Sequence, residues 1–277
     1  RNCDALEEAW WSRAYNALFD HCAFIFDNLE NHYEVTSNHF LSNVVGLHFA
    51  CQPFRGHERG QEWHAFCRKA LEEEITVQVL DDGADFESSI PYHRLVCELF
   101  LGSGWLARVH GEALSDAYYA RLGAMVAYLA GVLRPDGMLP QIGDADDGRL
   151  HIFSRAGAWD PQFGAHILGP AGHVLGRDDG AVDGADQWEV FWWGMPVQQS
   201  QTAQALAPVA KMFPDAGHAV WRDGGDYLLF CNSIVGTKGF GNHKHNDQLS
   251  FEFHHDGRPL IVDPGSWVYT SDFDARN

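Results

Sequence analysis

The first half of the chain repeats apolar residues at helical spacing. Between residues 57 and 80, 92 and 110, and 115 and 133, apolar side chains recur at steps of three and four. Glu74 is the one polar residue on the apolar side of the first of these segments. Short breaks such as LDDGADF and RPDGMLP separate the segments. The pattern predicts stacked helical hairpins over residues 1–134, an arrangement typical of a helical toroid or solenoid.

The period of the pattern changes to two after residue 217. HAVWRDGGDYLLFCNS predicts two strands around the turn Asp223-Gly224-Gly225-Asp226. LSFEFHHDGRPLIVD predicts two more strands around Asp256-Gly257. Helices followed by antiparallel hairpins indicate an α+β chain of two domains.

The polar stretch QQSQTAQALAPVA separates the two patterns. We therefore predict a helical domain over residues 1–205 and an antiparallel sheet domain that starts at residue 206 and continues to residue 277. The chain begins at Arg1 and ends soon after a strand-like segment. We expect a fragment of a longer protein, truncated within the β domain, whose leader would not be visible.

Composition and charge narrow the function classes. Of the 277 residues, 45% are hydrophobic, 19 are basic and 38 are acidic, which gives a formal charge of −19. Nucleic acid is excluded as a partner because there is no basic surface to release counterions. No run of about 18 apolar residues occurs, which excludes a transmembrane span. The six cysteines form no CxxC pair, which predicts reduced structural thiols. The sequence leaves a homo-oligomer open.

The segment TSNHFLSNVVGLHFAC, residues 36–51, has an unusual polar face. Written as a helix, its apolar side carries Phe40, Leu41, Val44, Leu47 and Cys51, and its other side carries Asn38, His39, Ser42, Asn43 and Gly46. A solvent-facing helix would normally carry Lys, Glu or Arg there. Small neutral donors and a histidine suit the wall of a cleft. A face that is satisfied by packing against other helices explains them equally well.

The segment DDGADFESSIPYHRLV, residues 81–96, places a tyrosine at the start of a helix. Pro91 fits a first turn, where its missing N–H costs nothing. Tyr92 and His93 then follow in that turn, beside a loop rich in turn residues. A tyrosine there can exchange a proton if a nearby positive charge lowers its pKa. A core tyrosine with one hydrogen bond is the alternative.

The loop PQIGDADDGRL, residues 140–150, holds three carboxylates, Asp144, Asp146 and Asp147. The spacing of an EF-hand and its closing Glu are missing, which argues against a calcium loop. An Asp-rich turn that caps its own backbone is favoured. Ion pairs to Arg149 or another arginine are the alternative.

The polar run GNHKHNDQ, residues 241–248, stands directly before a strand-like segment. Residues i and i+2 of an extended chain share a face, so we expect His243 and His245 to converge. Asp263 ends the second strand of the same hairpin and would return to the same end as His245. Two histidines and an aspartate make a reasonable zinc set, which usually needs a fourth ligand or a water.

Together these stretches resemble a known family. GNHKHNDQLSFEFHHDGRPLIVDPGSWVY is similar to the C-terminal β-sheet motif of the heparinase II/III-like polysaccharide lyases, which are related to alginate, heparin and heparan lyases. NHYEVTSNHFLSNVVGL, FESSIPYHRL and IGDADDGR are similar to the helical motifs of that family, in the same order. The resemblance implies an incomplete (α/α) toroid followed by an antiparallel β-sandwich. It also implies an enzyme that cleaves a uronic-acid glycan by β-elimination.

The resemblance implies a role for each matching residue. Asn38 and His39 match a pair that neutralises the uronate carboxylate and assists removal of the C5 proton. Tyr92 matches a tyrosine that acts as general acid, and in some members as base. His243 matches a histidine of the β domain that faces the toroid.

The resemblance also implies a cofactor. His245 and Asp263 match two ligands of a structural zinc, whose third ligand in the family is a histidine that would lie beyond Asn277. Such a zinc would hold the strand end rigid and orient His243.

The predicted substrate is an acidic polysaccharide. Asn43, Arg94, Asn242 and Lys244 are the predicted substrate-binding residues. The charge of −19 disfavours a sulfated polymer and favours a non-sulfated uronate polysaccharide. The resemblance implies a periplasmic or secreted protein.

Two other functions stay open. A non-catalytic glycan-binding or surface-polysaccharide assembly protein could use the same fold. A zinc-dependent glycan hydrolase is the other alternative.

Overall fold

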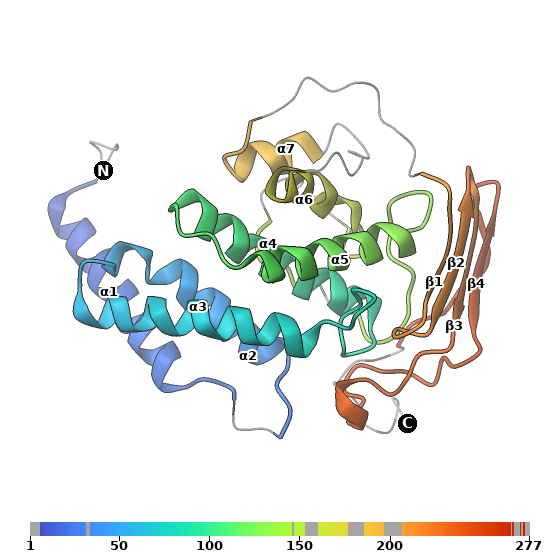
Figure 1. Ribbon diagram of the computed structural model, residues 1–277, viewed down its shortest axis with the longest axis horizontal. Coiled ribbons are helices and arrows are strands. Elements are labelled where there is room, and N and C mark those ends of the chain that lie inside the picture. The colour runs from blue at the N-terminus through green and yellow to red at the C-terminus, as the bar shows by residue number, and fades with distance from the viewer. Residues whose placement is uncertain are drawn as a thin grey trace.

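The protein, described here by a computed structural model, consists of stacked helices followed by one antiparallel sheet (Figure 1). The structure describes residues 6–31, 34–145, 147–152, 160–176, 186–196, 207–266, 268, 272 and 274. Its α-helices are α1 (Glu8–Asp27), α2 (Asn38–Ala50), α3 (Glu58–Gln78), α4 (Ile90–Val109), α5 (Asp116–Val132), α6 (Leu168–Leu175) and α7 (Asp186–Trp192). Its strands are β1 (Val209–Phe213), β2 (His218–Asp223), β3 (Asp226–Cys231), β4 (Phe251–His255) and β5 (Arg258–Ile261). Short 3-10 helices are η1 (Gln52–Phe54), η2 (Ala165–Ile167) and η3 (Thr237–Gly239).

Helices α2, α4 and α5 each begin after a serine cap. The three periodic segments of the first half are confirmed as α3, α4 and α5, and the segment 36–51 as α2. Ser37, Ser89 and Ser115 each accept a hydrogen bond from a backbone N–H of the helix that follows. Pro91 lies in the first turn of α4, as predicted.

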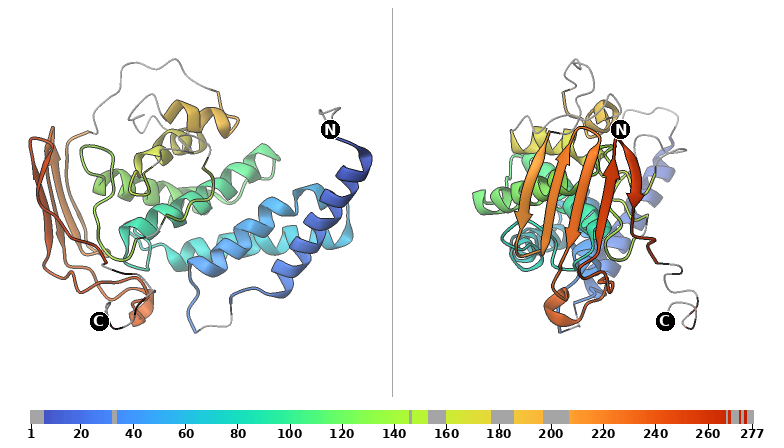
Figure 2. Two further views of the ribbon diagram at one scale, coloured as in Figure 1. Left: turned by 180° about the vertical axis from the view of Figure 1, so that it is seen from behind. Right: turned by 90° about the vertical axis from the view of Figure 1, so that its right-hand side faces the viewer.

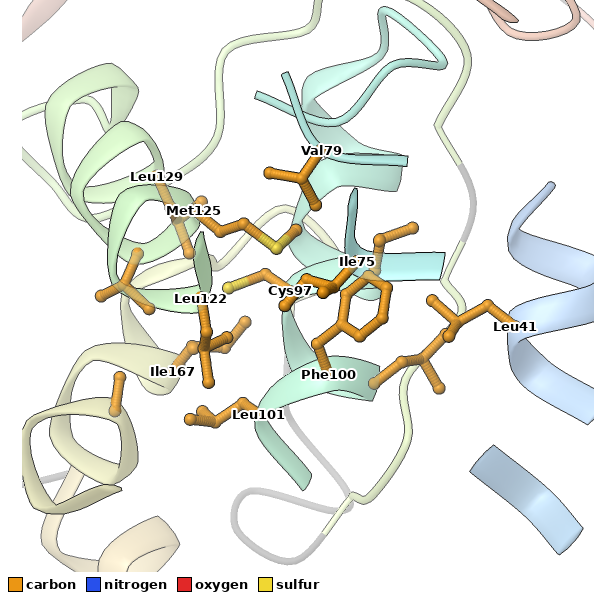
Figure 3. Close-up of a cluster of buried hydrophobic side chains, with 14 of the residues drawn as sticks. Leu41, Ile75, Val79, Cys97, Phe100, Leu101, Leu122, Met125, Leu129 and Ile167 are labelled. Atoms are coloured by element: carbon orange, nitrogen blue, oxygen red, sulfur yellow. The ribbon is translucent and has the colours of Figure 1, made fainter. Parts of the chain in front are cut away.

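Helices α2 to α5 share one hydrophobic core, part of which Figure 3 shows. Leu41 of α2, Ile75 of α3, Phe100 of α4 and Leu122 of α5 are fully or almost fully buried there. Glu74 is also buried, as its place on the apolar side of α3 requires. Its carboxylate accepts hydrogen bonds from the Thr36 hydroxyl and the Gln78 amide, both at 2.7 Å, which offsets the cost of burying a charge.

The cysteines behave as the sequence predicts wherever the structure describes them. Five are buried and free: Cys22, Cys51, Cys67, Cys97 and Cys231. Cys3 lies outside the described residues.

The strands form a meander in the order β1-β2-β3-β4-β5, and every neighbouring pair is antiparallel (Figure 2). Both predicted hairpins are confirmed, with turns between Asp223 and Asp226 and at Asp256-Gly257. Asp256 and Gly257 have φ angles of 53° and 73°, the left-handed pair that a two-residue hairpin turn needs.

One face of the sheet packs against α5 and fixes the sheet relative to the helices (Figure 1). The Tyr227 hydroxyl donates to Val132 O at 2.7 Å, and the Tyr128 hydroxyl lies 2.7 Å from His218 Nδ1. Arg222 donates to the carbonyl oxygens of Leu133 and Ala130 at the C-terminal end of α5. Cationic donors at that end satisfy carbonyls that have no partner within the helix.

The predicted fold class is confirmed: a helical region comes first and an antiparallel β region follows. The predicted boundary between residues 205 and 206 falls outside the described residues and stays a prediction. Among the helices of the described residues, none is long and apolar enough to cross a membrane.

Candidate active site

Three residues far apart in the sequence meet between the helices and the sheet. Asn38 is the first residue of α2, Tyr92 lies in the first turn of α4, and His243 precedes β4. The rings of Tyr92 and His243 stack at 3.7 Å between centroids with an interplanar angle of 15°. Asn38 Nδ2 lies 3.4 Å from His243 Nε2. The structure thus brings together three of the four predicted catalytic residues.

Glu87 connects these residues and was missed by the sequence reasoning. Its carboxylate is fully buried and accepts hydrogen bonds from the Asn38 backbone N–H at 2.8 Å and from Asn38 Nδ2 at 2.7 Å. The same carboxylate lies 3.3 Å from His243 Nε2. The signal that could have found it is an acidic residue five positions before Tyr92 in a loop of small turn residues.

Asp144 holds the other side of His243. Its Oδ2 lies 3.2 Å from His243 Nδ1, and its Oδ1 lies 2.8 Å from His245 Nε2. Both oxygens therefore face histidines of the β region, a pairing that the predicted self-capping turn did not include. Asp146 lies outside the described residues, and Asp147 is exposed.

Gly143 allows this close approach. Its φ is +78°, and a Cβ there would stand 2.7 Å from His243 O and 2.8 Å from Ser89 Cβ. Both the left-handed backbone and the lack of space require glycine. Asp144 N–H donates to His243 O at 2.9 Å, and the Ser89 hydroxyl donates to Asp144 O at 2.6 Å. These contacts fix the loop of Asp144 to both the start of α4 and the β region.

A buried histidine supports the loop that carries Glu87. The Asp85 N–H donates to His93 Nδ1 at 3.0 Å, so Nε2 carries the proton and donates to Met125 O at 3.1 Å. Burial lowers the pKa of His93 to about 3. Burial, and then the charge of Glu87, raise the pKa of Asp85 well above its usual range.

His39 and Asn43 lie on the same helix as Asn38 and contact Glu30 instead, His39 through the Glu30 carboxylate and Asn43 through the Glu30 backbone. His39 Nδ1 is 2.9 Å from Glu30 Oε2, and the His39 side chain is 59% exposed. Asn43 Oδ1 accepts a hydrogen bond from the Glu30 backbone N–H at 2.8 Å. Both residues therefore lie beside Glu30 and not in the Asn38–Tyr92–His243 cluster.

The predicted substrate-binding cations are buried. Lys244 Nζ donates to His245 O at 2.7 Å and forms an ion pair with Asp247. Arg94 is fully buried, and after His166 and Arg149 its charge is a further cause of the low pKa of Glu98. Asn242 is exposed, in the turn before His243. Among these residues Asn242 is the one whose side chain faces solvent.

The two predicted zinc ligands contact other groups. Asp263 Oδ1 accepts from the Gly265 N–H at 2.8 Å. The hydrogen bond between His245 and Asp144 raises the pKa of His245, so a zinc ion would have to displace a proton from this ring. The described part of the chain holds no group of three or more His, Cys, Asp or Glu side chains that could bind a metal. These residues do not fit a zinc site by themselves, and zinc stays a prediction.

Two family models match the chain. The model of the heparinase II/III N-terminus matches residues 2–159, and the heparinase II/III-like C-terminal model matches residues 206–277. A heparin-sulfate lyase from Pedobacter heparinus is 26% identical over 252 residues, which cover 89% of this chain and 34% of that protein.

Solved structures share the fold. Heparinase III has a TM-score of 0.74 at 18% identity, with 99% of this chain and 42% of that chain covered. Heparan sulfate lyase HepC from Pedobacter heparinus has a TM-score of 0.67 at 21% identity, with 99% of this chain and 39% of that chain covered. The chain therefore spans about two-fifths or less of the length of these relatives. With both family models matched in order, the chain belongs to the heparinase II/III family.

Proposed function

We propose that this chain carries the active site of a polysaccharide lyase that cleaves a uronic-acid glycan by β-elimination. The observation that supports this function best is the convergence of an amide, a phenol and an imidazole at one point, Asn38, Tyr92 and His243. Family membership favours the same reaction.

Asn38 fits the first requirement of this reaction. The C5–H of a uronate is a very weak acid until the negative charge of the carboxylate is neutralised. A neutral amide that donates to this carboxylate stabilises the charge that develops when the proton leaves. Asn38 Nδ2 donates to the buried carboxylate of Glu87 and lies 3.4 Å from His243 Nε2. We propose that this amide donates to the substrate carboxylate beside the imidazole.

Tyr92 and His243 fit the second requirement, which is proton transfer. The C5 proton must be withdrawn, the C4–O bond breaks as the C4–C5 double bond forms, and the departing oxygen must receive a proton. A stacked phenol and imidazole provide two groups that can accept and donate protons at the same place. His39, exposed beside Glu30, joins this proposal as a contact to the substrate from the outer part of α2.

The proposed substrate is a uronate polymer with little or no sulfate. The chain has a formal charge of −19, which repels a dense polyanion. Lys244 and Arg149 form ion pairs with carboxylates of the protein itself. A heparin-sulfate lyase is nevertheless among the relatives, so sulfated polymers belong in the test. Because such polymers lie outside the cytoplasm, we also propose a periplasmic or secreted location.

A panel assay tests this function. The protein is incubated with sulfated and non-sulfated uronate polysaccharides, and the ultraviolet absorbance of the new C4–C5 double bond is followed. We expect Tyr92→Phe and His243→Ala each to lower the rate at least about 100-fold. His39→Ala is expected to have a smaller effect, because this side chain lies apart from the cluster.

Two matched variants control for damage to the fold. Tyr119→Phe removes a buried hydroxyl that donates to Gly104 O, and His255→Ala removes an exposed histidine of β4. Both are expected to keep the wild-type rate. New reducing ends without the double bond would indicate hydrolysis, and binding without cleavage of any polymer would indicate a glycan-binding protein.

A further inference from the structure

Glu87 contacts Asn38 with both of its carboxylate oxygens. Oε1 accepts from the backbone N–H of Asn38 at 2.8 Å, and Oε2 accepts from Nδ2 of the same residue at 2.7 Å. A carboxylate of this kind can only accept hydrogen bonds. The amide of Asn38 must therefore turn its NH₂ group, and not its oxygen, toward Glu87.

The loop around Glu87 is fixed from three directions. The Glu87 N–H donates to Asp85 Oδ2 at 3.2 Å, and Phe86 O accepts from the Thr237 N–H at 2.7 Å. Ser88 has a φ of 60°, a left-handed conformation that costs free energy for a residue other than glycine. Gly236 packs so closely that a Cβ would stand 2.5 Å from Phe86 O. Such a loop fixes where the Glu87 side chain points.

Asp85 supports the charge state that this arrangement needs. It is fully buried beside Glu87, and its pKa is held well above the usual range by burial and then by the charge of Glu87. Glu87 directs one oxygen at each of two N–H donors of Asn38, so both of its oxygens act as acceptors.

We propose that Glu87 is a positioning residue, which fixes the rotation of the Asn38 amide so that N–H, and not C=O, faces the substrate carboxylate. This inference rests on the proposed function for its effect on catalysis. Its structural part, the fixed amide, does not depend on the reaction.

Glu87→Gln separates positioning from packing, because the replacement has the same shape. The introduced side chain has one accepting oxygen, which the Asn38 backbone N–H requires. Its NH₂ group then faces Asn38 Nδ2, and two donors cannot pair. The Asn38 amide is expected to rotate by a half turn, which places its oxygen where the substrate carboxylate needs a donor.

Glu74→Gln is the matched control. Glu74 is also a buried carboxylate with two side-chain donors, Thr36 and Gln78, and it lies beside the same start of α2. Both variants are expected to lower the unfolding temperature. Only Glu87→Gln is expected to lower kcat, by about 100-fold with KM changed less than about threefold, since the Asn38 donor in the transition state is lost and the contact of this carboxylate with His243 Nε2 changes as well.

A readout independent of turnover is the NMR signal of the Asn38 side-chain NH₂ group, assigned by its loss in Asn38→Asp. We expect Glu87→Gln to move this signal and Glu74→Gln to leave it in place. An unmoved signal, or equal losses of kcat in the two variants, would overturn the inference. If the wild-type chain cleaves no polymer, the proposed function fails, and the NMR signal alone decides whether Glu87 fixes the amide.

Discussion

At the scale of single residues, His93 connects the core to the candidate active site. It accepts from the Asp85 N–H and donates to Met125 O of α5. Asp85 in turn accepts from the Glu87 N–H. The neutral ring of His93 thus supports the loop that places Glu87 against Asn38.

The low pKa of His93 predicts an acid-sensitive contribution to stability. Its pKa is about 3 in the folded chain and ordinarily about 6.5, so unfolding takes up a proton between these values. The contribution of the neutral His93 ring to the free energy of unfolding is complete above pH 6.5 and is lost as the pH falls toward 3. Over this window the free energy of unfolding should fall by about 1.4 kcal/mol per pH unit more in the wild type than in His93→Gln.

Denaturant unfolding at several pH values measures this difference in slope. His255→Gln serves as the control, because His255 is an exposed histidine paired with Asp226. If the free energy of unfolding changed with pH in the same way in the wild type and in His93→Gln, the assignment of a neutral buried ring would be contradicted.

At the scale of elements, two helical glycines have opposite surroundings. A Cβ at Gly46 of α2 would meet no atom within 4 Å. A Cβ at Gly131 of α5 would stand 2.7 Å from Cζ of Phe213, a buried residue of β1. The first glycine leaves the polar face of α2 open, and the second lets the sheet approach α5.

These surroundings predict opposite effects for the same substitution. Gly46→Ala should stabilise the chain by about 0.5–1 kcal/mol, because alanine restricts the unfolded backbone and favours the helix. Gly131→Ala should destabilise it by about 1–3 kcal/mol, because a packed ring must shift. Thermal unfolding of the two variants measures whether each substitution raises or lowers the stability. Equal effects would contradict the close packing of α5 on β1.

The open position at Gly46 also bears on the polar face of α2, for which the sequence left two explanations. Asn38 is buried against Glu87 and His243, which is the packed explanation. His39 and Ser42 are exposed and Gly46 borders open space, which is the explanation of an accessible wall. Each explanation holds for one part of the helix.

At the scale of the whole molecule, the site depends on how the sheet sits on the helices. His243 belongs to the β region, whereas Asn38, Tyr92 and Glu87 belong to the helical region. Arg222 is one of the groups that join the two regions. Its buried guanidinium donates to the last carbonyls of α5.

Arg222→Met is therefore expected to weaken both stability and activity. It keeps an apolar stem but removes the donors, which should cost about 2–3 kcal/mol because buried carbonyls lose charged partners. The rate of elimination should fall as well, although Arg222 does not contact the site residues named above, because the position of His243 relaxes. Arg258→Met, on the exposed face of β5, is the control. An unchanged unfolding free energy for Arg222→Met would show that these bonds do not hold the sheet on α5.

The sequence by itself determined the elements and most of the reactive groups. Helices α2 to α5 follow from apolar spacing, and the hairpins follow from Asp-Gly turns. These signals lie within windows of about 10–20 residues, in which backbone conformation is largely decided by neighbours. The motifs around Asn38, Tyr92 and His243 were recognised for the same reason.

Only the tertiary structure decided which groups face one another. Glu87 and Asn38 are 49 positions apart, and Asp144 and His243 are 99 positions apart. A local pattern cannot show that a carboxylate will be buried against a distant amide or imidazole, because that pairing is set by how the sheet packs on α5 and how the loops meet there. For the same physical reason the sequence placed Lys244 and Arg94 at the substrate, whereas the fold buries both side chains.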